Sequence, residues 1–129
     1  MLKRIVDIVY KAGEIYTGAG SDLSVSLKTS NVDLVTKYDK KIQTFLYNEL
    51  KRIVPDAALL GEEGDGNKEL TDGYCFIIDP IDGTTNFVKG FQHSAISVGL
   101  AKDRELIIGV VYDPDLDNMY YAEKGKGAY

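Results

Sequence analysis

The sequence predicts an α+β fold, because helical and strand-like patterns occupy different parts of the chain. Apolar residues recur at helical spacing over residues 1–17 and 37–54, with one strand-like segment between them at 23–28. After residue 57 the chain consists of short apolar runs that are separated by polar turns. This order is typical of helices and strands that form separate layers, and it differs from the regular alternation of a βαβ fold.

The first helix is expected to end near residues 18–20. Ile5, Val9 and Ala12 share one face of this predicted helix, and the sequence Gly-Ala-Gly at 18–20 is a common helix stop. Residues 23–28 then alternate between apolar and polar side chains, which indicates a half-buried strand.

The second helix is expected over residues 37–54. Thr36 is a candidate N-cap, and Asp39 follows three residues later in place of the glutamate of a capping box. The helical spacing of apolar residues continues until Pro55, which cannot extend a helix.

The second half of the chain predicts a sheet. A short strand is expected at 57–60, followed by a loop rich in glycine and acidic residues at 64–73. Residues 74–78 form a continuous apolar run, as expected of a central strand. Three further strand-like runs follow at 95–101, 106–112 and 118–122. The short turns between these three runs indicate an antiparallel meander.

The composition is that of a globular domain and excludes several classes of protein. Lys and Arg number 15 against 20 Asp and Glu, so the formal charge is −5, which argues against binding to nucleic acid phosphates. No apolar stretch approaches the roughly 20 residues that span a bilayer, and the charged N-terminus does not suit a signal peptide. The single cysteine, Cys75, cannot form an internal disulfide and is expected to be buried. We therefore expect a cytoplasmic protein with neither nucleic acid nor membrane as partner.

Acidic residues follow two of the predicted strands. Glu62 and Glu63 come just after the first short strand, and Asp79 and Asp82 come just after the central one. Four carboxylates that converge on one place repel one another, and a divalent cation removes that repulsion. Hard oxygen ligands suit Mg²⁺, Mn²⁺ or Ca²⁺, whereas one Cys and one His cannot build a structural zinc site.

The segment that starts at Asp79 combines features of a cation site and of an anion site. A turn stiffened by Pro80 is expected to aim the two aspartates at one point, and the carbonyl of Ile81 is a further hard oxygen donor. Gly83 lets the backbone approach a ligand, and free N–H groups near Thr84 attract anions. This combination fits a phosphate that is bound to a metal.

Each motif also has an interpretation that involves no chemistry. Glu62 and Glu63 alone are more often a solvated surface pair, and Thr36 with Asp39 is more often only a helix cap. Lys28 is more often a solvated strand residue. An EF-hand is disfavoured by the proline inside the acidic segment and by the lack of a glutamate at the twelfth position. No Ser/His/Asp or Cys/His arrangement follows from the spacings.

Three motifs resemble those of the inositol monophosphatase family. They are residues 27–39, Gly61-Glu62-Glu63, and Asp79-Pro80-Ile81-Asp82-Gly83-Thr84-Thr85-Asn86-Phe87, in the family's order and separations. The resemblance implies a layered α/β sandwich in which two helices pack on an antiparallel sheet. It also implies that residues 1–129 are the N-terminal part of such a domain and that the C-terminal part is absent. The family's later Trp-Asp motif, which supplies another carboxylate to its second metal, has no counterpart here, since the chain contains no Trp.

The resemblance implies a set of metal ligands. Glu62, Asp79 and the carbonyl of Ile81 correspond to ligands of a first metal. Asp79, which bridges, and Asp82 correspond to ligands of a second metal, and Glu63 corresponds to a weaker or more distant carboxylate. The implied cofactor is Mg²⁺, with two or three ions in the complete enzyme and Mn²⁺ as the alternative.

The resemblance also implies groups that handle water and phosphate. Thr84, together with Glu62, corresponds to the group that orients the attacking water, and Asp39 corresponds to the acidic residue that supports Thr84. The backbone amides of Gly83 and Thr84 correspond to phosphate donors, and Lys28 to a basic residue near the site.

The implied activity is hydrolysis of a small phosphate monoester, such as inositol monophosphate, by metal-activated water in a lithium-sensitive homodimer. Fructose-1,6-bisphosphatase, bisphosphate nucleotidase and histidinol-phosphatase activities on the same scaffold are alternatives. A catalytically silent metal-binding or interaction fragment is an alternative of a different class. We expect the chain by itself to be inactive or weakly active, and its uncovered apolar surface to favour oligomers.

Overall fold

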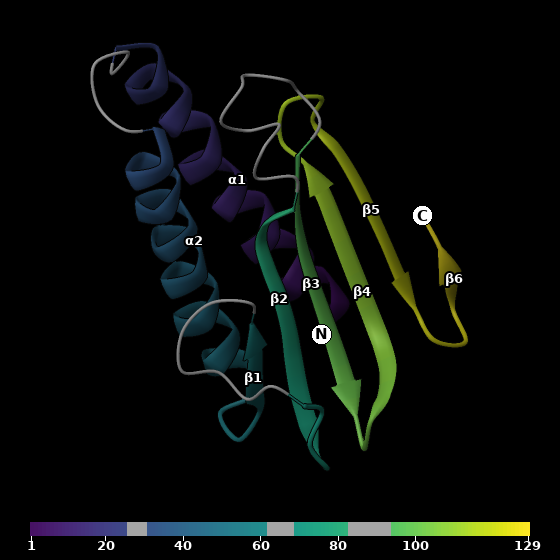
Figure 1. Cartoon of the computed structure of the whole chain (residues 1–129). Helices are drawn as coiled ribbons and strands as arrows, with labels where there is room; N and C mark the ends of the chain where they lie inside the picture. Colours follow the sequence, from purple (N-terminus) through teal and green to yellow (C-terminus); the bar gives the residue numbers. More distant parts are fainter. Residues whose placement is uncertain (26–30, 62–68, 83–93) are drawn as a thin grey trace.

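Two helices and a six-stranded sheet make up the described part of the chain (Figure 1). This computed structural model describes residues 1–25, 31–61, 69–82 and 94–129, with the backbone alone at 19–25, 31–36 and 82. The helices are α1 (Leu2–Val25) and α2 (Asn31–Ile53). The strands are β1 (Ala58–Gly61), β2 (Tyr74–Asp82), β3 (Ala95–Lys102), β4 (Glu105–Asp113), β5 (Asn118–Glu123) and β6 (Gly127–Ala128).

The strands lie in the sheet in the order in which they occur in the chain. β1 pairs with β2 in parallel, whereas each later pair of neighbours is antiparallel. The α+β architecture and the meander of β3, β4 and β5 are confirmed, but the sheet is mixed rather than wholly antiparallel. The parallel pair is feasible because about a dozen residues separate β1 from β2, enough to return the chain to the start of the sheet.

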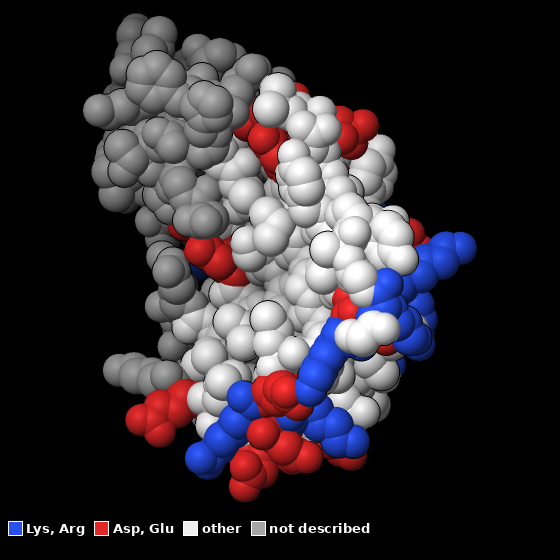
Figure 2. Space-filling view, turned by 90° about the vertical axis from the view of Figure 1, so that its right-hand side faces the viewer, with Lys and Arg blue, Asp and Glu red and all other residues white. Residues whose placement is uncertain are grey.

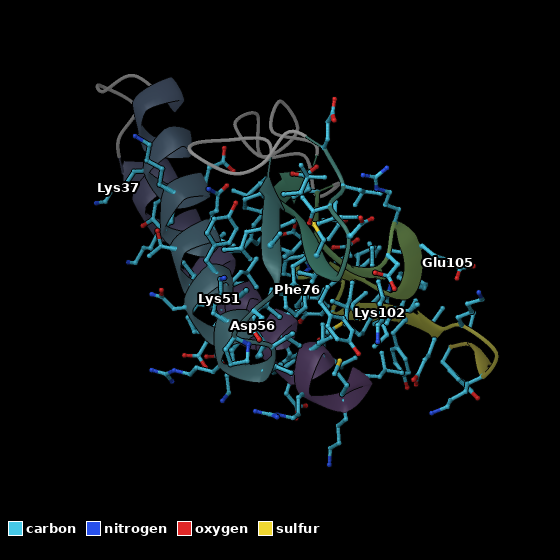
Figure 3. All side chains as sticks on the ribbon, turned by 90° about the horizontal axis from the view of Figure 1, so that it is seen from below. Lys37, Lys51, Asp56, Phe76, Lys102 and Glu105 are labelled. Atoms are coloured by element: carbon cyan, nitrogen blue, oxygen red, sulfur yellow. The ribbon has the colours of Figure 1, made fainter. Side chains whose placement is uncertain are left out.

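Both helices cover the same face of the sheet (Figure 1). α1 packs against β3, β4 and β5, α2 packs against β2, and the two helices also contact each other. The buried side chains between these layers come from one stripe of each helix and from alternate positions of the strands. They include Ile5, Val9, Ala12, Ile42, Leu46, Leu50, Phe76, Ile78, Val98, Leu100 and Val110. Phe76 is fully buried and lies near the middle of the molecule in the view of Figure 3.

α1 is longer than the sequence predicts. The helix continues past Gly18 as far as Val25, so the predicted stop at 18–20 is wrong. The predicted strand at 23–28 is also wrong for its first three residues, and the rest of it lies outside the described residues. Gly18 keeps a negative φ, whereas a glycine that ends a helix usually takes the left-handed conformation. A short apolar-polar alternation does not by itself distinguish a strand from the last turns of a helix.

α2 begins at Asn31, several residues before its expected start. Thr36 therefore lies inside the helix, and its predicted role as N-cap is wrong. The helix ends before Pro55, as predicted. There the Lys51 ammonium donates hydrogen bonds to the carbonyl oxygens of Pro55 and Ala57, at 3.3 and 2.7 Å. These bonds hold the turn that leads from α2 into β1, at the opposite end of α2 from Lys37 (Figure 3).

The strands predicted after residue 57 agree with the structure within one residue at each end, except that β2 is longer. β2 continues as far as Asp82, through residues that were expected to form a turn. The β3–β4 hairpin has Asp103 and Arg104 at its tip, both with positive φ, as a two-residue turn of type I′ requires. Cys75 is fully buried, as predicted. Within the described ranges, neither helix is apolar enough over a sufficient length to cross a membrane.

Candidate metal and phosphate site

The C-terminal ends of β1 and β2 meet at one edge of the sheet. Because the two strands are parallel, Gly61 at the end of β1 lies opposite Ile78, the residue directly before Asp79. Glu62 and Glu63 follow Gly61 in the sequence and lie outside the described residues. Because of this parallel pairing, the residues directly before the two acidic motifs are neighbours in the sheet. They lie at the C-terminal ends of parallel strands, where such sheets commonly bind ligands.

β2 contains a β-bulge within the acidic motif. Asp79 pairs with Ser97, but Asp82 pairs with Ala95, so β2 has one residue more than β3 over this stretch. Pro80 lies in the bulge, where a residue without an N–H group is tolerated. The expected turn is thus wrong, and a bulged strand takes its place. The bulge puts backbone positions 79 and 82 opposite alternate residues of β3, which is the spacing of positions on one face of a sheet.

Asp79 lines a hollow on the face of the sheet that the helices leave open. The hollow has a volume of about 700 Å³ and is formed by β1, β2, β3 and β4, with mostly apolar walls that include Ile77, Gly99 and Val111. Asp79 is half-buried in it, beside Ser97. Apolar walls lower the local dielectric, so a carboxylate in this position attracts a cation more strongly than one in open solvent.

The described oxygen donors at the end of β2 fit a hard divalent cation. The carboxylate of Asp79 and the backbone carbonyl of Ile81 belong to the same bulged stretch, and both are ligand types that Mg²⁺ prefers. The buried side chain of Ile81, 3% exposed, anchors that stretch in the core. Within the described ranges, no three His, Cys, Asp or Glu side chains gather into a metal cluster.

Asp39 begins a polar stripe on α2. Asp39 is only 6% exposed, and Gln43 and Tyr47 follow it at intervals of four residues, so the three share one side of the helix. The side-chain oxygens of Gln43 and Tyr47 are buried. The hydroxyl of Tyr47 reaches Gly61 at the end of β1, and burial raises the pKa of Tyr47. One end of the stripe therefore contacts the strand from which Glu62 follows.

The structure describes three of the predicted site residues in full and a fourth by its backbone. Asp39, Asp79 and Ile81 are described in full, and Asp82 by its backbone alone. The other predicted site residues lie outside the described ranges, namely Lys28, Glu62, Glu63, Gly83 and Thr84. Their roles as ligands, phosphate donors or water-orienting groups stay predictions.

The motifs do not predict Gln43 and Tyr47 as part of the site. A signal for them exists in the sequence, because both continue the four-residue spacing that starts at Asp39. Polar residues at every fourth position of an amphipathic helix, next to the apolar stripe, indicate a polar contact with a neighbouring element.

The sequence as a whole matches a known family. A sequence model described as the inositol monophosphatase family matches residues 1–129. The chain belongs to the inositol monophosphatase family. Over 128 residues it is 44% identical to inositol monophosphatase 1 of Homo sapiens, a match that covers 96% of this chain and 46% of the human protein.

Solved structures of relatives share the fold. The extragenic suppressor protein suhB of Bartonella henselae superposes with a TM-score of 0.84 at 31% identity, over 98% of this chain and 49% of that one. Inositol monophosphatase II of Staphylococcus aureus MSSA476 has a TM-score of 0.82 at 34% identity, over 95% and 46%. SaIMPase-II bound to inositol monophosphate has a TM-score of 0.78 at 32% identity, over 95% of this chain and 44% of that one. SaIMPase-II bound to 2′AMP has a TM-score of 0.82 at 35% identity, over 95% of this chain and 45% of that one. The chain spans about half the length of the relatives that it matches.

Proposed function

We propose that residues 1–129 are the N-terminal part of a phosphatase that uses Mg²⁺ to hydrolyse a small phosphate monoester, such as inositol monophosphate. The observation that carries this proposal is the shared edge at which β1 and the bulged end of β2 terminate, with Asp79 and Ile81 as oxygen donors. Family membership supports metal-dependent phosphatase chemistry. The relative SaIMPase-II with bound inositol monophosphate supports the substrate class.

Asp79 would be the central ligand of the proposed site and would be shared by both metal positions. Glu62 and the carbonyl of Ile81 would help to hold the first ion, and Asp82 the second. Glu63 would be a weaker or more distant ligand. Two findings support this set: the parallel register that aligns the end of β1 with β2, and the bulge that places positions 79 and 82 opposite alternate residues of β3.

The proposed reaction depends on groups that orient water and hold phosphate. The Thr84 hydroxyl, together with Glu62, would orient the attacking water by hydrogen bonding, and Asp39 would support Thr84 by accepting a hydrogen bond from its hydroxyl. The amides of Gly83 and Thr84 bind phosphate oxygens, and Lys28 adds positive charge nearby. When bound, Mg²⁺ lowers the pKa of water and neutralises charge on the phosphoryl group. The low exposure of Asp39 supports its role as an acceptor, because buried carboxylates require hydrogen-bond partners.

The proposal also covers the cofactor, the inhibitor, the oligomeric state and the location of the enzyme. The complete site would hold two or three Mg²⁺ ions, which Mn²⁺ could replace, and Li⁺ would inhibit it. The enzyme would be a homodimer in the cytoplasm. Membership of a metal-dependent family supports the first part. The open, apolar face of the sheet supports self-association.

A nucleoside monophosphate is the second candidate substrate. The observation that favours it is the relative SaIMPase-II with bound 2′AMP, which is also a phosphate monoester of a ring hydroxyl. Hydrolysis assays on inositol monophosphate and 2′AMP by the complete enzyme would rank the two substrates.

Calorimetric titration with Mg²⁺, in the presence and absence of inorganic phosphate, tests the site directly. We expect phosphate to tighten Mg²⁺ binding, because cation and anion occupy one site. Asp79→Asn is expected to weaken Mg²⁺ binding by at least about tenfold, because it removes the bridging carboxylate.

Asp72→Asn provides the matched control. Asp72 lies just before β2, at the end opposite to Asp79, and its exposed carboxylate pairs with Arg104 at 3.3 Å. This variant should keep Mg²⁺ affinity within about twofold of the unchanged chain, because an exposed ion pair contributes little. Mg²⁺ binding that is independent of phosphate, or that survives Asp79→Asn, would contradict the proposal.

A further inference from the structure

Helix α2 contacts the last residue of β1 through a tyrosine hydroxyl. A Cβ atom added to Gly61 would lie 2.4 Å from the hydroxyl oxygen of Tyr47 and 3.4 Å from Oε1 of Gln43. The shorter distance is far below a van der Waals contact, so only glycine fits here at the present spacing of helix and strand. The ring carbon Cζ of Tyr47 would be 3.6 Å away, an ordinary contact, so the hydroxyl oxygen alone accounts for the clash.

The Tyr47 hydroxyl is buried but forms no hydrogen bond with any residue that the structure describes. Burial of a hydroxyl without a partner is unfavourable, so folding stability does not explain its presence. What the hydroxyl does provide is contact with the backbone of β1 at its C-terminal end.

Helix α2 cannot easily move away from this contact. Leu46 and Leu50, which flank Tyr47 on the helix, are fully buried in the core. Lys51 also bonds to the carbonyl oxygen of Ala57, directly before β1, at 2.7 Å. The backbone of the helix is therefore held in place, so a side chain at position 61 would have to displace the end of β1 or turn the ring of Tyr47.

We propose that Gly61 is a positioning residue, and that its contact with the Tyr47 hydroxyl fixes the end of β1 beside β2, directly before the proposed ligand Glu62 in the sequence. This inference rests on the proposed function, which makes Glu62 a metal ligand. Gly61 lies opposite Ile78 in the parallel ladder, one residue before Asp79. Displacement of β1 at this point would change the position of Gly61 relative to the strand that carries Asp79.

Three variants test the inference: Gly61→Ala, Tyr47→Phe, and the double variant. Mg²⁺ affinity is measured by calorimetry in the presence of inorganic phosphate, and thermal unfolding is measured without metal. Gly61→Ala is expected to weaken Mg²⁺ binding by about tenfold and to lower Tm by about 4 °C. Tyr47→Phe should leave both values close to those of the unchanged chain, because the hydroxyl has no hydrogen bond to a described residue that could be lost. The double variant should recover most of both losses, because the clashing oxygen is gone.

Gly109→Ala in β4 is the matched control. Apart from its chain neighbours, no described atom lies within 4 Å of a Cβ at Gly109, although this glycine also lies in the sheet. Its substitution should lower neither Tm nor Mg²⁺ affinity, which separates the contact at Gly61 from a general effect of replacing strand glycines.

Each other outcome overturns a defined part of the inference. A double variant no better than Gly61→Ala would rule out the hydroxyl as the clashing group. Loss of Mg²⁺ affinity in Tyr47→Phe alone would show that the hydroxyl acts directly rather than by contact. A Gly61→Ala chain that unfolds earlier but binds Mg²⁺ normally would reduce Gly61 to a packing residue. If the unchanged chain bound no Mg²⁺, the proposed function and the positioning role would both fail. The thermal unfolding of the three variants would still show whether the Tyr47 hydroxyl clashes with a side chain at position 61.

Discussion

At the scale of single residues, two buried tyrosines hold the turn between β4 and β5. Tyr16 on α1 donates a hydrogen bond to Oδ2 of Asp115, and Tyr112 on β4 donates one to Oδ1 of Asp117, each at 2.7 Å. Burial, together with the neighbouring carboxylates, raises the pKa of both hydroxyls above the ordinary value of 10.0. The turn is therefore attached both to the helix layer and to its own hairpin.

The raised pKa values of Tyr16 and Tyr112 predict that stability falls in alkaline solution. Below pH 10 both the folded and the unfolded chain keep these protons, so the two hydroxyls make their full contribution to the free energy of unfolding. Above the unfolded value of 10.0 the unfolded chain releases protons that the folded chain retains, and stability is lost as pH rises towards the folded pKa. Urea unfolding at about pH 8, 10 and 11 measures this slope.

Tyr16→Phe should make that alkaline slope shallower, and at neutral pH it should cost about 1 kcal/mol because Asp115 loses its donor. An unchanged slope in this variant would contradict the assignment to Tyr16.

At the scale of elements, α1 depends on a glycine where it crosses β4. A Cβ at Gly13 would lie 2.4 and 2.9 Å from the ring carbons Cε1 and Cδ1 of Tyr112, and the ring is held in place by its bond to Asp117. For Gly18 in the same helix, no described atom of another element lies within 4 Å of the Cβ position. Packing therefore requires the first glycine and not the second.

This difference predicts opposite effects for the same substitution in one helix. Gly13→Ala should lower the free energy of unfolding by about 1–3 kcal/mol, because it overpacks the contact with Tyr112. Gly18→Ala should raise it by up to about 1 kcal/mol, because alanine favours the helix and meets no obstacle. Urea unfolding of both variants provides the measurement, and equal effects would refute the interpretation.

At the scale of the whole molecule, charged side chains of both signs gather in one part of the surface. In the face shown in Figure 2 they meet at the lower end, uncharged residues extend across the middle, and further acidic side chains lie at the upper end. The pair Lys124–Glu105 joins two exposed side chains, and Lys126–Glu123 joins an exposed lysine to a partly buried glutamate, so neither contributes much to stability. On the open face of the sheet, Leu106 and Val111 are 55% and 41% exposed. Exposed apolar side chains beside a hollow are typical of contact surfaces.

We expect the chain by itself to self-associate through this open face, because its exposed apolar side chains have no other cover among the described residues. Sedimentation should give an average mass above 14.2 kDa that rises with concentration. Leu106→Thr should weaken the association because Leu106 lines the hollow. Leu116→Thr is the control, because Leu116 is also 55% exposed but lies in the β4–β5 turn. A monomer at every concentration would contradict this prediction.

The sequence by itself determines the layers, the family and the acidic motifs. The helical spacing of Ile42, Leu46 and Leu50 suffices to predict α2 and its buried face, because such a stripe is stable only against a core. The apolar run before Asp79 likewise suffices to predict a central strand. Element boundaries were less well determined, as Thr36 shows, because a side chain suited to cap a helix is also tolerated inside one.

Only the tertiary structure decided how these motifs are held. The parallel pairing of β1 with β2, the bulge at Pro80 and the contact of Tyr47 with Gly61 join residues that are separated in the chain. Local sequence patterns record the preference of each segment for helix or strand. Register and close approach instead depend on which partner each segment meets, and that is settled when helices and sheet pack together.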